Sequence, residues 1–168
     1  LCKDKILINV DKGYDYFQQL FELMEKTGTT QQVIIKSGKL PEQVLSENAD
    51  VIKNTIYMPI IHLDGKNAAA QVEANLKLSP VAIECCFKKY SPQVESLLQR
   101  IREAGVKVWI NSLWPSLCDG HDDDRAVELK EPDESWGWIL DRGATLIQTD
   151  RPKELIQYLK KHKARKLK

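Results

Sequence analysis

The sequence has few of the features that mark specialised classes of protein. Its 168 residues carry a formal net charge of only +1, which gives no reason to expect nucleic acid or an anionic membrane as a partner. No apolar run approaches the ~18 residues of a membrane span, and residues 1–5 do not resemble a signal peptide. Neither GxGxxG nor GxxxxGK(S/T) occurs, so the common nucleotide-binding loops are missing.

Cysteine is also scarce. The four cysteines, Cys2, Cys85, Cys86 and Cys118, match no zinc spacing, and adjacent cysteines seldom bond to each other. We therefore expect free thiols that are buried or partly buried, which disfavours a disulfide scaffold. The cysteines do not determine the cellular compartment, and a periplasmic or other extracytoplasmic location is compatible with them.

What the sequence does contain is a regular alternation of short apolar runs and amphipathic segments. Ser91 caps the clearest helix, and Gly105 ends it. Strands are expected at 6–10, 33–36, 55–60, 81–86, 106–111 and 144–148. Helices are expected at 14–27, 41–47, 66–78, 92–104, 134–142 (capped by Asp133) and 153–161.

Strict alternation of this kind predicts a parallel sheet covered by helices, in one domain over residues 1–168. An open doubly wound sheet and a (β/α)8 barrel both fit. Counting alone favours the open sheet, because a barrel typically needs ~250 residues and two further units. The residues at the ends of the strands favour the barrel.

Polar side chains follow the apolar strands where sites are built in parallel α/β proteins. Lys36 is the most informative of them, because an unpaired lysine at the end of a buried strand is costly. Together the strand ends suit an anionic substrate held with a hard cation. The residues are Asn9, Asp11, Lys12, Lys36, Ser37, Glu84, Trp109, Asn111, Gln148 and Asp150.

Three of these segments resemble the glycerophosphodiester phosphodiesterase family, a family of lipid metabolism. The segment "ILINVDKG" resembles its asparagine-aliphatic-glutamate block, and "VKVWIN" resembles its late strand that ends in tryptophan-threonine-valine-asparagine. The segment "LDRGATLIQTDRP" is similar to its closing glycine-x-x-x-isoleucine-x-threonine-aspartate-x-proline block. The segments "GHDDD" and "SWGW" are similar to a bacterial branch. The resemblance covers residues 6 to about 159.

The resemblance implies a TIM (β/α)8 barrel of the PLC-like phosphodiesterase type, of which this chain supplies strands three to eight. The family's histidine-arginine-glycine, glutamate-x-aspartate and histidine-aspartate blocks belong to the first two units and do not occur here. His62, His121 and His162 match none of them, so the catalytic residues stay unassigned, although His62 follows the third expected strand and is a candidate for the rim.

The resemblance and the strand positions imply roles for the remaining site residues. Asp11 takes the place of the family's glutamate as ligand of a divalent metal, Mg²⁺ or Ca²⁺. Strand alternation would point Lys12 away from Asp11, unless the strand has already ended before it. Further contacts with the substrate are expected from Lys36 (phosphate), Glu84 (polar substrate or metal-bound water), Trp109 (glycerol wall), Asn111 and His121. His121 is about equally expected to brace its loop, and Asp150 and Arg151 either brace a turn or contact substrate.

The loop 112–132 is the longest predicted connection, and long loops in compact domains are usually functional or disordered. Trp114 and Leu117 give this loop apolar side chains to bury, so we expect it to form an ordered wall at the rim.

The expected function is metal-dependent hydrolysis of a glycerophosphodiester to an alcohol and glycerol phosphate. The alternative is a non-catalytic α/β binding module or a degenerate relative of the family. The expected partners are a small phosphodiester and either a missing amino-terminal segment or another copy of the chain.

Overall fold

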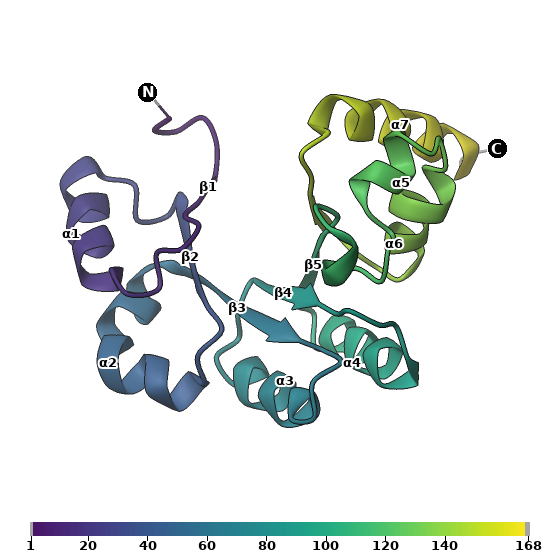
Figure 1. The fold of residues 1–168 in the computed structure, drawn as a ribbon. Helices are drawn as coiled ribbons and strands as arrows, with labels where there is room; N and C mark the ends of the chain where they lie inside the picture. Colours follow the sequence, from purple (N-terminus) through teal and green to yellow (C-terminus); the bar gives the residue numbers. More distant parts are fainter. Residues whose placement is uncertain (1, 167–168) are drawn as a thin grey trace.

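The computed structural model describes residues 2–166, with side chains to residue 163. Its strands form one parallel sheet in the order β1-β2-β3-β4-β5-β6. Because every strand pairs with the next one along the chain, the sheet curls into a half-barrel with β1 and β6 at its two edges (Figure 1). This alternation of parallel strands and helices is compatible with part of a TIM-like barrel, and it excludes the strand order of a doubly wound sheet.

The strands are β1 (Ile8–Asn9), β2 (Val33–Ser37), β3 (Ile56–His62), β4 (Ala82–Cys86), β5 (Lys107–Asn111) and β6 (Leu146–Gln148). The larger helices are α1 (Phe17–Thr27), α2 (Pro41–Asn54), α3 (Ala68–Leu76), α4 (Pro92–Glu103) and α7 (Pro152–Lys166). Shorter turns are η1 (Pro115–Leu117), α5 (Asp123–Val127), the π-helical η2 (Asp133–Gly137) and α6 (Trp138–Asp141). None of the helices between residues 2 and 166 is both long and apolar enough to cross a membrane.

Two apolar layers hold the half-barrel together. Outward-facing strand residues such as Ile35 and Ile83 pack against the helices, which lie on the convex side (Figure 1). Strand residues alternate between faces, so their neighbours point to the concave side. There Ile34, Met58 and Ala82 form a smaller inner cluster with Ile56, Trp109 and Leu146. The polar ends of the strands lie beyond this inner cluster.

Several local expectations are confirmed, and others are wrong. Ser91 accepts a hydrogen bond from the backbone of Val94, as a helix cap should. The helix expected from Pro41 to residue 47 does end there, because Asn48 has a non-helical backbone (φ −143°); a second helical segment, which was not expected, continues α2 to Asn54 and packs Val51 into the core. Asp133 is not a cap, since its carboxylate accepts a hydrogen bond from Tyr158 instead.

The expected loop 112–132 is ordered, with η1 and α5 inside it. A buried carboxylate, Asp123, fixes it to the sheet. That carboxylate accepts hydrogen bonds from Ser112 Oγ (2.6 Å), Trp136 Nε1 (2.9 Å), Thr149 Oγ1 (2.8 Å) and the backbone N–H of Asp150 (2.8 Å). One side chain therefore joins the ends of β5 and β6 to η2.

The segment after β6 continues this bracing. Arg151 forms ion pairs with Glu128 (3.1 Å) and Asp124 (3.7 Å) of the α5 region. Of the two roles considered for Arg151, the structure therefore supports bracing.

The turn before β6 requires a glycine. Gly143 has φ +83°, and a Cβ there would collide with the side chain of Arg102.

Replacing Asp123 should destabilise the fold strongly. Asp123→Ala leaves four donors without their acceptor, three of them on side chains, and we expect the free energy of unfolding to fall by about 3 kcal/mol. Asp124→Ala is the matched control. It removes the carboxylate of the next residue, which is exposed, and should lower the free energy of unfolding by less than about 0.5 kcal/mol. Urea unfolding of both variants measures the difference, and equal effects would contradict the proposed anchor.

Candidate functional site

The candidate site lies on the concave face, where the strands end. Lys36 and Glu84 are inward-facing residues of β2 and β4, and Asn111 ends β5. Glu84 is in register with Trp109 of β5, and Asn111 is in register with Gln148 of β6. The sheet therefore brings together polar residues that are far apart in the sequence.

These residues form a continuous polar network. Lys36 Nζ lies 2.9 Å from Glu84 Oε2 and 3.4 Å from Asp11 Oδ1. Asn111 donates to Glu84 Oε1 (2.8 Å) and accepts at Oδ1 from Trp109 Nε1 (2.8 Å). All three residues follow or end apolar strands of parallel units in the sequence, which predicts that Asp11 and Glu84 lie at one rim with Lys36 between them, and the structure confirms this arrangement.

The network is buried at one end and open at the other. The side chains of Lys36 and Glu84 are 3% and 5% exposed, whereas that of Asp11 is 61% exposed. Burial by itself would lower the pKa of Lys36, but the hydrogen bond and charge of Glu84, with a smaller effect of Asp11, raise it above its usual value. Lys36 is thus a fixed cation, and Asp11 is the carboxylate that solvent reaches.

A cavity of about 440 Å³ opens above this network. It is bounded by the strand ends, by the turn after β1, and by the beginning of the loop 112–132, which confirms that this loop lies at the rim. Its lining residues are Asp11, Lys12, Tyr14, Lys36, Gly38, Ile60, His62, Glu84, Cys86, Asn111, Leu113, Trp114, Leu117 and Gln148.

Two aromatic residues differ from expectation. Trp109 does not line the cavity, because it lies one layer deeper, with the inner cluster around Met58. Trp114, which is 59% exposed, and Leu117 line the cavity in place of Trp109. Trp114 was expected to bury its side chain, and its exposure makes it available to a ligand.

His121 is not brought to the rim. Its ring stacks on Trp138 at a centroid distance of 3.6 Å and an interplanar angle of 7°, and Nδ1 bonds the backbone carbonyl of Glu134. Burial lowers the pKa of His121, so the ring is neutral near pH 7. Of its two expected roles, the structure supports bracing of the loop.

Sequence reasoning placed part of the lining and missed the rest. Lys12 was expected to point away from Asp11 unless the strand had already ended; β1 ends at Asn9 and Lys12 has a left-handed backbone (φ +54°), so this exception applies and Lys12 lines the cavity. His62, which follows a strand and was a candidate for the rim, also lines the cavity, together with Cys86, its partner in register on β4. Cys86 was missed, although period-two counting from Glu84 could have placed it there.

The residues present give only partial support to a metal ion. Asp11 offers a hard oxygen donor at the cavity, as Mg²⁺ or Ca²⁺ requires. Both oxygens of Glu84 already bind Lys36 and Asn111. Within residues 2–166 no group of three or more His, Cys, Asp or Glu side chains is placed to hold a metal. A metal at Asp11 would therefore depend on other oxygen donors, such as backbone or amide carbonyls and water.

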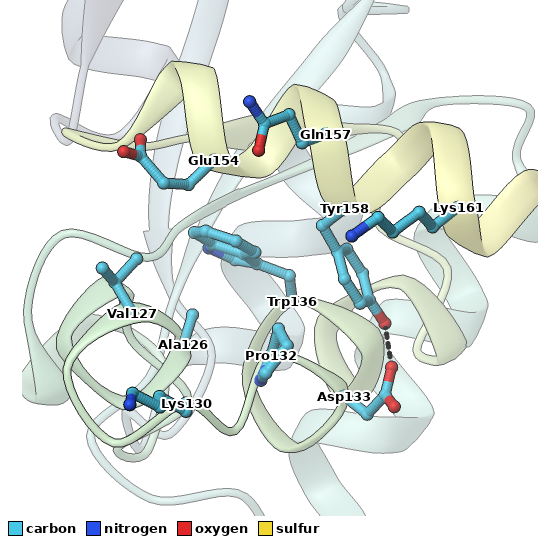
Figure 2. A pocket seen from close by; sticks show the side chains of 10 residues that line it. All are labelled: Ala126, Val127, Lys130, Pro132, Asp133, Trp136, Glu154, Gln157, Tyr158 and Lys161. Atoms are coloured by element: carbon cyan, nitrogen blue, oxygen red, sulfur yellow. Dashed lines mark hydrogen bonds between the residues drawn. The ribbon is translucent and has the colours of Figure 1, made fainter.

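A second cavity, of about 380 Å³, lies on the helical side of the molecule. Figure 2 shows it between α7 and the segment from Ala126 to Trp136, with the hydroxyl of Tyr158 bonded to Asp133 (2.7 Å). It contains no residue from the strand ends, so the rim cavity is the stronger candidate.

The fold and the site define a parallel α/β half-barrel with a polar cavity at the carboxyl ends of its strands. The chain belongs to the family DUF4996, described as a domain of unknown function, whose profile matches residues 57–159. That range contains Glu84 and Asn111 but neither Asp11 nor Lys36. No match was found among curated proteins. The phosphodiesterase resemblance therefore stays a proposal.

Removing Glu84 should cost about 3 kcal/mol of unfolding free energy, because Lys36 would keep only the exposed Asp11 as partner. Glu84→Ala measured by urea unfolding tests this. The matched control is Glu47→Ala, which breaks the exposed pair with Lys39 and should cost less than about 1 kcal/mol. If Glu84→Ala proved as mild as its control, the network would not be a stabilising unit.

The buried thiols should be unreactive although one of them lines the cavity. Burial, with the charge of Glu84, raises the pKa of Cys86 to about 12, and burial raises the pKa of Cys118 to about 12 as well. Burial also raises the pKa of Cys85, whereas Cys2 is exposed. At pH 8 we expect Ellman's reagent to modify one thiol rapidly in the folded chain and four in urea. Rapid modification of a second thiol in the folded chain would contradict this.

Proposed function

We propose that this chain forms six units of a (β/α)8 barrel of the PLC-like phosphodiesterase type, and that the complete barrel hydrolyses glycerophosphodiesters. The observation that carries the proposal is the Lys36–Glu84–Asn111 network beneath a polar cavity at the carboxyl rim. The motif resemblance adds the reaction class: a phosphodiester is cleaved by water to an alcohol and glycerol phosphate.

The two edges of the half-barrel support completion by further strands. Within the described residues, β1 and β6 each pair with one neighbouring strand only, so each has one open backbone edge. Ile6 and Leu7 are exposed beside β1, and Ile156 is exposed on α7. Unpaired edges and exposed apolar side chains favour association with another segment. Two more βα units, supplied by an upstream segment, would cover both edges.

The residues present would bind and orient the substrate. Asp11 projects an accessible carboxylate into the cavity, and Trp114 provides an apolar surface for the glycerol part of a substrate. A divalent metal, when bound, would polarise the phosphate. The proton-transferring histidines that the resemblance implies would come from the upstream segment, since His62 matches no family position.

A non-catalytic binding module is the second candidate. One observation favours it: both oxygens of Glu84 and both polar atoms of the Asn111 amide already have partners within the network. A site made of satisfied groups can hold a ligand without acting on it. The two candidates differ in whether completion of the barrel produces turnover.

We expect no useful hydrolysis of glycerophosphocholine by residues 1–168 alone, and steady hydrolysis once the upstream segment is restored. Each missing acid or base is worth roughly 10²–10⁴ in rate. The assay measures choline release with Mg²⁺ or Ca²⁺, and Asp11→Ala in the restored protein should reduce it at least tenfold. Turnover by the 168-residue chain that Asp11→Ala abolishes would place the catalytic groups within this chain, and no turnover by either form would favour the binding module.

A further inference from the structure

Two lysines line the rim cavity, and their surroundings differ. Lys36 is buried, whereas Lys12 is exposed on the turn that follows β1. The sequence assigned the phosphate to Lys36 because it ends a strand. The surroundings of the two lysines indicate which of them is available to bind a phosphate.

The charge of Lys36 is already compensated. Its ammonium lies within ion-pair distance of Glu84 (2.9 Å) and Asp11 (3.4 Å), so the three groups together carry a net charge of −1 when both carboxylates are ionised. An incoming phosphate would have to displace a carboxylate from a side chain that is 3% exposed. Displacement of Glu84 would leave that carboxylate buried without its counter-ion, which is costly; displacement of Asp11 would remove from Lys36 the carboxylate proposed as the metal ligand.

The charge of Lys12 is uncompensated. Among residues 2–166 no carboxylate forms an ion pair with it, although it follows Asp11 directly in the sequence. Its left-handed backbone is unfavourable for a residue with a Cβ. The next residue, Gly13, is buried, and a Cβ there would contact Leu20 and Val10. This tight turn is what brings the Lys12 side chain to the cavity lining.

We infer that Lys12 is the residue that binds the anionic phosphate group of the ligand, and that Lys36 is a positioning residue that holds Asp11 and Glu84 in place. This inference rests on the proposed function, because it presumes a phosphate-bearing ligand at the rim. It divides between two lysines the roles that one lysine was expected to fill. A lysine ammonium at the mouth of the cavity attracts phosphate as a point charge.

The probe is glycerol phosphate, titrated calorimetrically into the 168-residue chain and into the chain with its upstream segment. Lys12→Met should weaken binding about tenfold, the loss of one charge-assisted contact. Lys12→Arg should restore most of the affinity. Neither change should alter urea unfolding, because the side chain is exposed. Lys39→Met is the matched control, an exposed lysine outside the cavity lining, and should leave the affinity unchanged.

Lys36→Met should show the opposite pattern, with lower stability in urea because Glu84 loses its buried counter-ion. If Lys12→Met binds glycerol phosphate as tightly as the parent chain, the inference is overturned while the proposed function stands. If neither parent form binds glycerol phosphate, the proposed function fails and this inference fails with it. A tenfold loss that arginine restores supports both.

Discussion

The buried ammonium of Lys36 is the constraint on which the concave face depends. It joins the carboxyl ends of β2 and β4 and the turn after β1 through two carboxylates. A buried charge is tolerated only when it is paired and hydrogen-bonded, and the Asn111 amide completes the pairing of Glu84. The strand ends are consequently fixed relative to one another, and Asp11 is held facing the cavity.

A second buried charge organises the wall of the cavity. Asp123 collects four donors from β5, η2 and the end of β6, and so fixes the loop that presents Trp114. The two anchors differ in whether one of their polar groups remains accessible to solvent. All the anchoring bonds of Asp123 serve the fold, whereas the network of Lys36 ends in a carboxylate that is largely exposed. Such an exposed end of a rigid network is suited to ligand binding.

The family match and the proposed function concern overlapping parts of the chain. The matched range 57–159 holds the Glu84–Asn111 half of the network and the wall loop, while Asp11, Lys12 and Lys36 precede it. The groups that would define the chemistry therefore lie in the part of the half-barrel that the match does not cover. The open edges at β1 and β6 support an assembly in which further strands complete the rim.

The sequence by itself determined the succession of parallel βα units, the cap at Ser91, and the placement of Lys36 and Glu84 at strand ends, because these depend on local periodicity and capping. It could not determine that Lys36 is neutralised by a carboxylate 48 residues away, or that Trp114 replaces Trp109 at the cavity. Those outcomes depend on the register between strands and on how deep each inward residue lies. Only the tertiary structure decided the direction of Lys12, because the sequence could not tell whether the strand had ended before it; the strand ends at Asn9, and a left-handed turn follows.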